Sequence, residues 1–160
     1  MERLWIMLAG YFKKIGMRRF TVMAIGNLFL GMGISIFKLS GLGNDPFSGM
    51  VMALSDRTGI TYALFLVMVN AVLFLYEITA GRKLIGAGTL INAFLLGYIV
   101  TFFYDIWLTF IGTPEQLPQR VITVLTGVII TSFGVSLYQY PNVGVAPYDS
   151  ISLIWCRKKP

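Results

Sequence analysis

Two short segments of the chain combine glycine, proline and aspartate in a pattern suited to holding a ligand. Each has the form Gly-x-x-Pro, and each proline opens a short apolar helix, predicted over 46–57 and 147–157. A helix N-terminus presents unpaired N–H groups and about half a positive charge. The predicted binding residues are Gly43, Asn44, Asp45, Pro46, Gly144, Pro147, Tyr148 and Asp149.

The two aspartates of these segments, Asp45 and Asp149, have two interpretations. A carboxylate inside a membrane is costly, and such residues often carry a coupling proton in transporters. Alternatively, Asp45 is the N-cap of the first short helix, and Asp149 complements the helix dipole from the first turn of the second. The sequence leaves both interpretations open.

The composition predicts that a bilayer is the main solvent of this chain. Hydrophobic residues make up 56% of the sequence and charged residues only 12%. The absence of histidine excludes histidine catalysis and histidine-ligated metals, and the single cysteine excludes a cysteine-cluster zinc site. No nucleophile–base pair stands out, so we expect no enzyme, metal or cofactor. The net charge of +6 is typical of loops beside anionic lipid, and we expect no nucleic acid partner.

Long apolar helices must position the two segments. Stretches with few charges predict four spans, at 20–40, 58–78, 84–111 and 121–140. Residues 1–19 mix apolar and basic positions, which predicts an interfacial helix and a cytoplasmic N-terminus. The expected fold class is therefore all-α, a polytopic transmembrane helix bundle.

An internal duplication relates the two Gly-x-x-Pro segments. A shift of 101 positions lays residues 19–53 on residues 120–154 without a gap, and glycines, a serine and the proline coincide. Identities in fixed register indicate a repeat. The repeat divides the chain into a first unit with its following spans, 20–111, and a second unit, 120–160. The second unit lacks two spans, so we expect a parent protein with roughly 50 further residues.

The repeat raises a question of topology. Its paired glycines give each long helix a face that another backbone can approach closely, which also leads us to expect a homodimer. Each short helix is about 16 Å long, too short to cross a hydrocarbon core of about 30 Å alone. Either loop and helix cross together, or they re-enter. Basic residues at equivalent positions, Arg19 with Arg120 and Arg57 with Lys158, favour crossing and repeats that point the same way.

Polar residues inside the spans are expected to join helices or to anchor them. Asn27, Asn70 and Asn92 are assigned to interhelical hydrogen bonds. Glu77 and Tyr138 lie at span ends, which predicts that both face the membrane interface.

Three stretches resemble the YczE/YitT-type family of bacterial integral membrane proteins. They read G-L-G-N-D-P-F-S at 41–48, G-A-G-T-L-I-N-A-F-L-L-G at 86–97, and N-V-G-V-A-P-Y-D-S-I-S-L at 142–153. The resemblance implies a multi-pass protein of the bacterial cytoplasmic (inner) membrane, longer than this chain. It also implies relatives grouped with small-molecule exporters, but it identifies no substrate.

These observations give two functional hypotheses. The first is a small-molecule membrane transporter, an exporter of small organic solutes, with its site between the two broken helices. The alternative is a non-transporting membrane protein that scaffolds or regulates a partner enzyme. Solute flux on the one hand, and stoichiometric co-purification of a partner on the other, distinguish the two.

Overall fold

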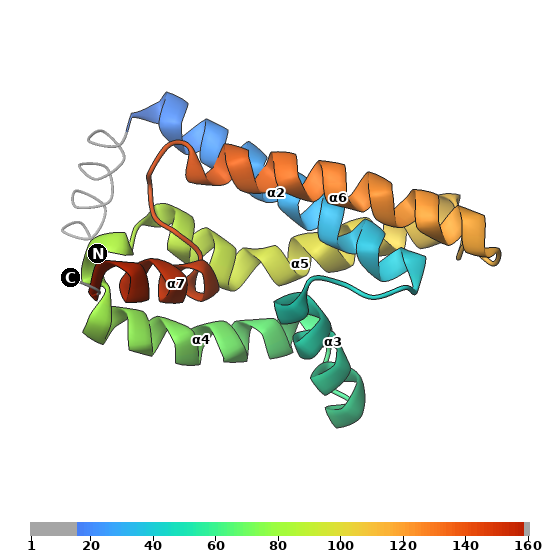
Figure 1. The fold of residues 1–160 in the computed structure, drawn as a ribbon, viewed down its shortest axis with the longest axis horizontal. Helices are drawn as coiled ribbons and strands as arrows, with labels where there is room; N and C mark the ends of the chain where they lie inside the picture. Colours follow the sequence, from blue (N-terminus) through green and yellow to red (C-terminus); the bar gives the residue numbers. More distant parts are fainter. Residues whose placement is uncertain (1–15, 159–160) are drawn as a thin grey trace, which may run out of the picture.

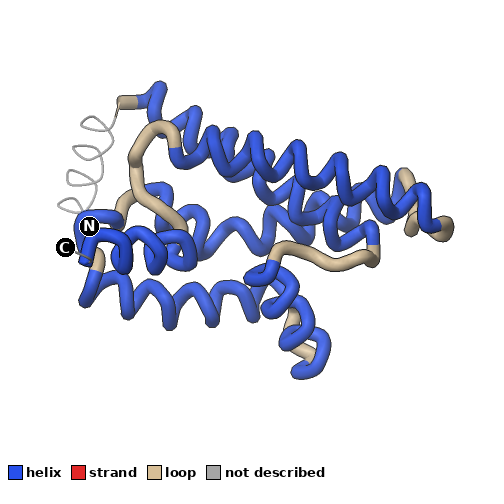
Figure 2. Tube along the Cα trace, in the orientation of Figure 1, coloured by secondary structure: helices blue, strands red, loops and turns tan. Residues whose placement is uncertain are grey.

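The computed structural model describes residues 16–158, which form helices joined by loops and turns, with no strand in this range (Figure 2). The elements are α2 (Met17–Ser40), α3 (Pro46–Thr58), α4 (Tyr62–Ala80), η1 (Arg82–Leu84), α5 (Ala87–Phe110), α6 (Leu117–Gln139) and α7 (Pro147–Lys158). The all-α fold class is therefore confirmed. Most of the predicted N-terminal amphipathic segment, 1–15, lies outside the described residues.

Four helices are long and apolar enough to cross a membrane: α2, α4, α5 and α6. This agrees with the four spans expected from the sequence. Their outer faces expose large apolar side chains, for example Val72, Phe110 and Ile129. Such a surface is suited to lipid and would aggregate in water.

Helices α2 and α6 pack side by side and run antiparallel (Figure 1). Their contacts pair early residues of one with late residues of the other: Gly26 lies against the Tyr138 backbone, and Gly134 lies against the Leu30 backbone. A Cβ atom on Gly26 would lie 2.7 Å from the Tyr138 Cα, so the two backbones touch only because the side chain is absent. The glycine faces that suggested a homodimer are thus occupied within the chain.

The prediction that the two aligned segments point the same way is wrong. Helices α2 and α6, which the 101-residue shift aligns with each other, run in opposite directions along the bundle. Conserved charge at equivalent positions was a weak argument, because the positive-inside rule sums all loops and does not follow single residues.

Helix α5 lies between α2 and α4, and asparagines fix it to both. The Asn92 amide donates to the Asn27 side-chain oxygen at 3.1 Å, and the Asn70 amide donates to the Ala93 carbonyl at 3.3 Å. The predicted interhelical hydrogen bonds of the three asparagines are therefore confirmed. In an apolar bundle these bonds also fix the register of the helices.

The short helices begin in the middle of the bundle and not at its ends (Figures 1 and 2). From the end of α2 the chain turns back inward before α3 begins, and α3 then leads outward again. From the opposite end of the bundle, the chain after α6 turns inward in the same manner, and α7 runs back beside α4. This arrangement corresponds to re-entry, so the expectation that the short helices cross is also wrong.

Candidate functional site

The first turns of α3 and α7 meet near the centre of the molecule. The Phe47 and Tyr148 rings stack there, with centroids 4.4 Å apart and planes 16° from parallel. Asp45 is the N-cap of α3, since its carboxylate accepts a hydrogen bond from the Ser48 N–H at 2.9 Å, and Pro46 occupies the first turn. The two Gly-x-x-Pro segments, far apart in sequence, are therefore neighbours in space.

Backbone contacts hold the loop before α7 in place. The Gly88 N–H donates to the Val143 carbonyl at 3.0 Å, and a Cβ atom on Gly144 would lie 2.7 Å from the Gly86 Cα. Gly144 has φ 118°, a conformation that L side chains rarely adopt, and Gly43 in the other loop has the same value. Irregular backbone at membrane depth requires such internal cover, because lipid offers no hydrogen-bond partners.

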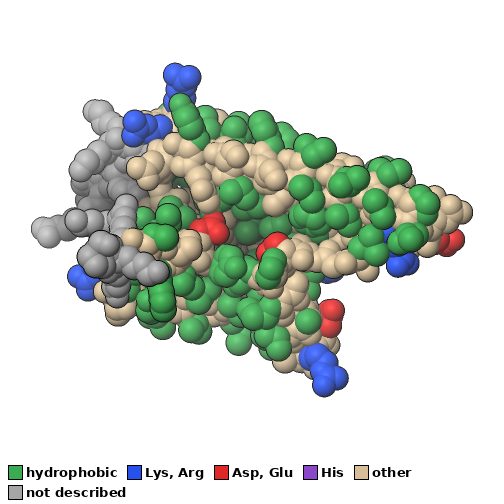
Figure 3. Space-filling view, viewed as in Figure 1, with side chains coloured by type: hydrophobic (Ala, Val, Ile, Leu, Met, Phe, Trp, Pro, Cys, Tyr) green, Lys and Arg blue, Asp and Glu red, His purple; other side chains and the backbone are tan. Residues whose placement is uncertain are grey.

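A cavity of about 250 Å³ lies where the two short helices begin. Its wall includes Leu30 of α2, Tyr62 of α4, Asn92 of α5 and Thr131 of α6, in addition to residues of α3 and α7. Every long helix and both short helices thus contribute to this central cavity. On the face seen in Figure 3, acidic side chains border a hollow at the middle of the molecule.

Three of the predicted binding residues line the central cavity: Asp45, Tyr148 and Asp149. Each belongs to the first turn or the N-cap of a short helix, so the helix starts determine where these side chains point. The aromatic residue Phe47 lines it as well, and the sequence contained a signal for it, since Phe47 aligns with Tyr148 in the repeat.

The other five predicted residues lie outside the central cavity. Gly43 and Asn44 line a groove against α6, of about 410 Å³, which Asp45 lines as well. Pro46 is exposed at the start of α3, whereas Pro147 is fully buried. Gly144 packs on the start of α5. The structure assigns these residues to the shape of the loops and not to the cavity wall.

Asp149 is held by neutral donors from the end of α6. The Tyr138 hydroxyl donates to the Asp149 carboxylate, and the Gln139 amide donates to the same oxygen at 3.2 Å. Tyr138 is fully buried, so its predicted place at the membrane interface is wrong. Its hydroxyl has a buried acceptor and does not need the interface, whereas Tyr140, two residues later, is 85% exposed.

Two hydroxyl groups of the cavity wall have no hydrogen-bond partner among the described residues. They are the hydroxyls of Tyr62 and Thr131, and both oxygens are inaccessible to solvent. Tyr62 as a whole is only 6% exposed. Because no solvent reaches either oxygen, these hydroxyls face the packed helices and not the open volume of the cavity. Nothing in the sequence distinguished Tyr62 or Thr131 from residues with a packing role.

Glu77 on α4 is a second departure from the sequence-based expectation. Its side chain is fully buried, and neither carboxylate oxygen has a hydrogen-bond partner among residues 16–158. The predicted interfacial position is therefore wrong. The cause is α7, which packs along this end of α4 and covers a side chain that would otherwise face outward.

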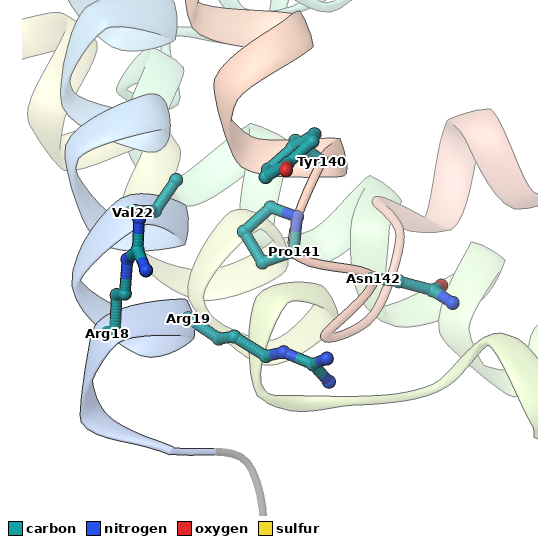
Figure 4. Close-up of a pocket in the computed structure, with 6 residues that line it drawn as sticks. All are labelled: Arg18, Arg19, Val22, Tyr140, Pro141 and Asn142. Carbon is teal, nitrogen blue, oxygen red and sulfur yellow. The ribbon is translucent and has the colours of Figure 1, made fainter.

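A larger cavity of about 510 Å³ lies at one end of the bundle (Figure 4). The Arg18 and Arg19 side chains extend from the start of α2 beside Tyr140, Pro141 and Asn142 of the loop after α6. Among the described residues, only the start of α2 and the loop after α6 form this cavity. The central cavity is the better candidate, because both Gly-x-x-Pro segments converge on it.

The fold defines an integral membrane protein built from a helical bundle. The chain belongs to the family of unknown function DUF6198, which it matches over residues 17–159. It is 28% identical over 142 residues to the uncharacterized protein YyaS of Bacillus subtilis, covering 85% of this chain and 67% of the relative. No solved structure matches the chain.

Two further relatives are more distant. An uncharacterized protein of Haemophilus influenzae is 28% identical over 81% of this chain and 57% of its own length. The uncharacterized membrane protein YczE of Bacillus subtilis is 24% identical over 88% of this chain and 64% of its own length. The chain thus spans roughly three fifths to two thirds of the curated relatives that it matches. The YczE part of the resemblance is supported, and the YitT part is not.

Proposed function

We propose that this protein is a membrane transporter that exports small organic solutes, with the central cavity as its binding site. One observation carries the proposal: a single cavity at the centre of the bundle touches all four long helices and the first turns of both short helices. Many transporters bind their substrate near the bilayer midplane, at discontinuous helices of this kind. Asp45 and Asp149 in the cavity wall support a polar occupant.

We further propose that the two aligned segments are inverted copies of one ancestral unit. If a twofold axis relates the copies, each contact between α2 and α6 should have a counterpart. The counterpart is found by adding 101 to the number of the α2 residue and subtracting 101 from the number of the α6 residue. Gly26 contacts Tyr138, and the exchanged pair, Gly127 and Phe37, is also in contact. Gly33 contacts Thr131, and the exchanged pair, Gly134 and Leu30, does the same. Inverted repeats support alternating access, because rocking one copy against the other opens the site to each side in turn.

The membrane orientation follows from the basic residues. The bundle end where α2 begins and α7 ends also contains η1, and its described basic positions are Arg18, Arg19, Arg82, Lys83, Arg157 and Lys158. The other end has fewer: Lys38, Arg57 and Arg120. The positive-inside rule assigns the richer end to the cytoplasm, so we propose a cytoplasmic N-terminus in the inner membrane.

Solute flux in proteoliposomes tests the transport proposal. The purified chain and its Asp45→Asn/Asp149→Asn double variant are reconstituted and assayed against a panel of labelled organic solutes. We expect flux from the wild type that the double variant reduces at least tenfold. Asp56→Asn is the matched control, since Asp56 is an exposed aspartate on α3 outside the cavity wall, and it should transport normally.

A different result would support the alternative function. If no solute moves and a second protein co-purifies in a fixed ratio from native membranes, a regulatory or scaffolding role replaces transport. Homodimer formation is tested in the same preparation from the mass of the detergent-solubilised particle.

A further inference from the structure

We propose that the solute is a small organic cation, an amine or quaternary ammonium compound of about the size of choline. This inference rests on the proposed function, since it names the substrate class of the same central cavity. Three features of the cavity wall support it: charge balance, an aromatic pair and volume.

The charge of the cavity wall is negative. Each short-helix N-terminus contributes about half a positive charge, so the two together contribute about one. Asp45 and Asp149 both line the cavity and contribute two negative charges when ionised. Their partners are neutral: the Ser48 N–H for Asp45, and the Tyr138 hydroxyl and the Gln139 amide for Asp149.

No lysine or arginine among the described residues lines the cavity to offset this charge. The Lys38 ammonium lies over the Tyr62 ring, 5.7 Å from its centroid, but the wall itself offers an anionic solute two carboxylates. This reverses the expectation from helix dipoles alone, under which two converging N-termini favour an anion. A cation instead restores neutrality at this site.

The Phe47 and Tyr148 rings favour the same class of solute. Both line the cavity and stack on one another at 4.4 Å, so their positions are mutually fixed. Aromatic faces attract ammonium groups, most strongly when water is excluded.

The volume limits the size of this solute. A cavity of about 250 Å³ lies below the range of roughly 300–1,000 Å³ that is usual for sites of drug-sized ligands. The site therefore suits a compact ammonium compound and not a large, multi-ring drug.

Three probes of one shape separate charge from size. Choline, its neutral isostere 3,3-dimethylbutan-1-ol and the anion 3,3-dimethylbutanoate are titrated calorimetrically into the full chain in detergent. We expect choline to bind at least tenfold more tightly than the neutral isostere, and the anion to bind most weakly. Equal affinities, or tighter binding of the anion, would overturn the proposal without the use of any variant.

Variants locate the effect. Asp149→Asn and Asp45→Asn keep the shape and the hydrogen-bond acceptor, and each should weaken choline binding at least fivefold while leaving the neutral isostere unchanged. Tyr148→Leu keeps both carboxylates and should also weaken choline binding. Asp56→Asn should bind choline as the wild type does. Choline binding that none of the three cavity variants affects would overturn the site.

The outcomes also separate this inference from the proposed function. If the neutral or anionic probe binds best and Asp149→Asn alters that binding, the cavity remains a solute site and only the cation preference fails. If no member of these probes or of the flux panel binds or moves, both proposals fail together.

Discussion

The glycine contact between α2 and α6 gives the sharpest quantitative prediction. Alanine at position 26 would place its Cβ 2.7 Å from the Tyr138 Cα and 2.8 Å from the Leu137 carbonyl carbon. Ordinary contact begins at 3.4 Å and the Tyr138 backbone nitrogen lies closer still, so the two backbones must separate by at least about 0.7 Å. A gap of that size forfeits a quarter or more of the local dispersion energy, and overpacking of this kind costs about 1–3 kcal/mol.

Gly127 is the matched control for this prediction. It lies at the equivalent position of α6, but a Cβ there would meet only the Phe37 ring at 3.3 Å and the Gly33 carbonyl oxygen at 3.4 Å. The ring can shift, and alanine gains about 1 kcal/mol over glycine in helix propensity. We therefore expect Gly127→Ala to change the free energy of unfolding by less than about 1 kcal/mol in either direction.

Reversible unfolding in mixed micelles of increasing SDS content measures both variants. Gly26→Ala should lower the free energy of unfolding by about 1–3 kcal/mol, and Gly127→Ala should lie close to the wild type. Equal effects of the two alanines would refute the antiparallel contact as described. A stabilising Gly26→Ala would do so as well.

Three further predictions concern buried polar groups and topology. Tyr138→Phe removes the hydroxyl that donates to Asp149 and should cost about 1.5–3 kcal/mol in the same SDS titration; an unchanged value would contradict the bond. Asn92→Ala should cost about 0.6–2 kcal/mol there, since it leaves its partner amide on α2 unpaired; a neutral effect would contradict that pairing. An impermeant maleimide should label exposed Cys156 only from the cytoplasmic side, and Thr58→Cys at the end of α3, in a cysteine-free background, only from the opposite side; cytoplasmic labelling of Thr58→Cys would exclude re-entry of α3.

The sequence was sufficient for the local features of the fold. Runs of about 20 apolar residues predict spanning helices because each helix satisfies its own backbone in lipid. The starts of the short helices at Pro46 and Pro147 were also predictable, since proline is favoured where its missing N–H has no intrahelical partner. Phe47 and Tyr148 each follow one of these prolines in the sequence, and their rings stack in the structure.

The features that failed depend on contacts between distant segments. Neither charge counts nor the repeat could determine the relative direction of α2 and α6. Re-entry and crossing place the same number of basic residues on the cytoplasmic side, so the positive-inside rule does not distinguish them. Tyr138 and Glu77 looked interfacial from their place in a span, but α2 packs against Tyr138 and α7 returns along the end of α4 that carries Glu77. Tyr62 and Thr131 have no local pattern at all, since only the packing of distant helices brings them into the cavity wall.

The order of synthesis gives the glycine contact of α2 a further consequence. Its partner, α6, emerges from the ribosome about 100 residues later, with α4 and α5 inserted in between. At about 5–20 residues per second, the nascent α2 waits roughly 5–20 s with its groove filled by lipid chains or held by the insertion machinery. Biogenesis therefore includes a late step in which lipid is displaced as α2 and α6 pack together. Variants such as Gly26→Ala should slow this step in addition to destabilising the folded protein.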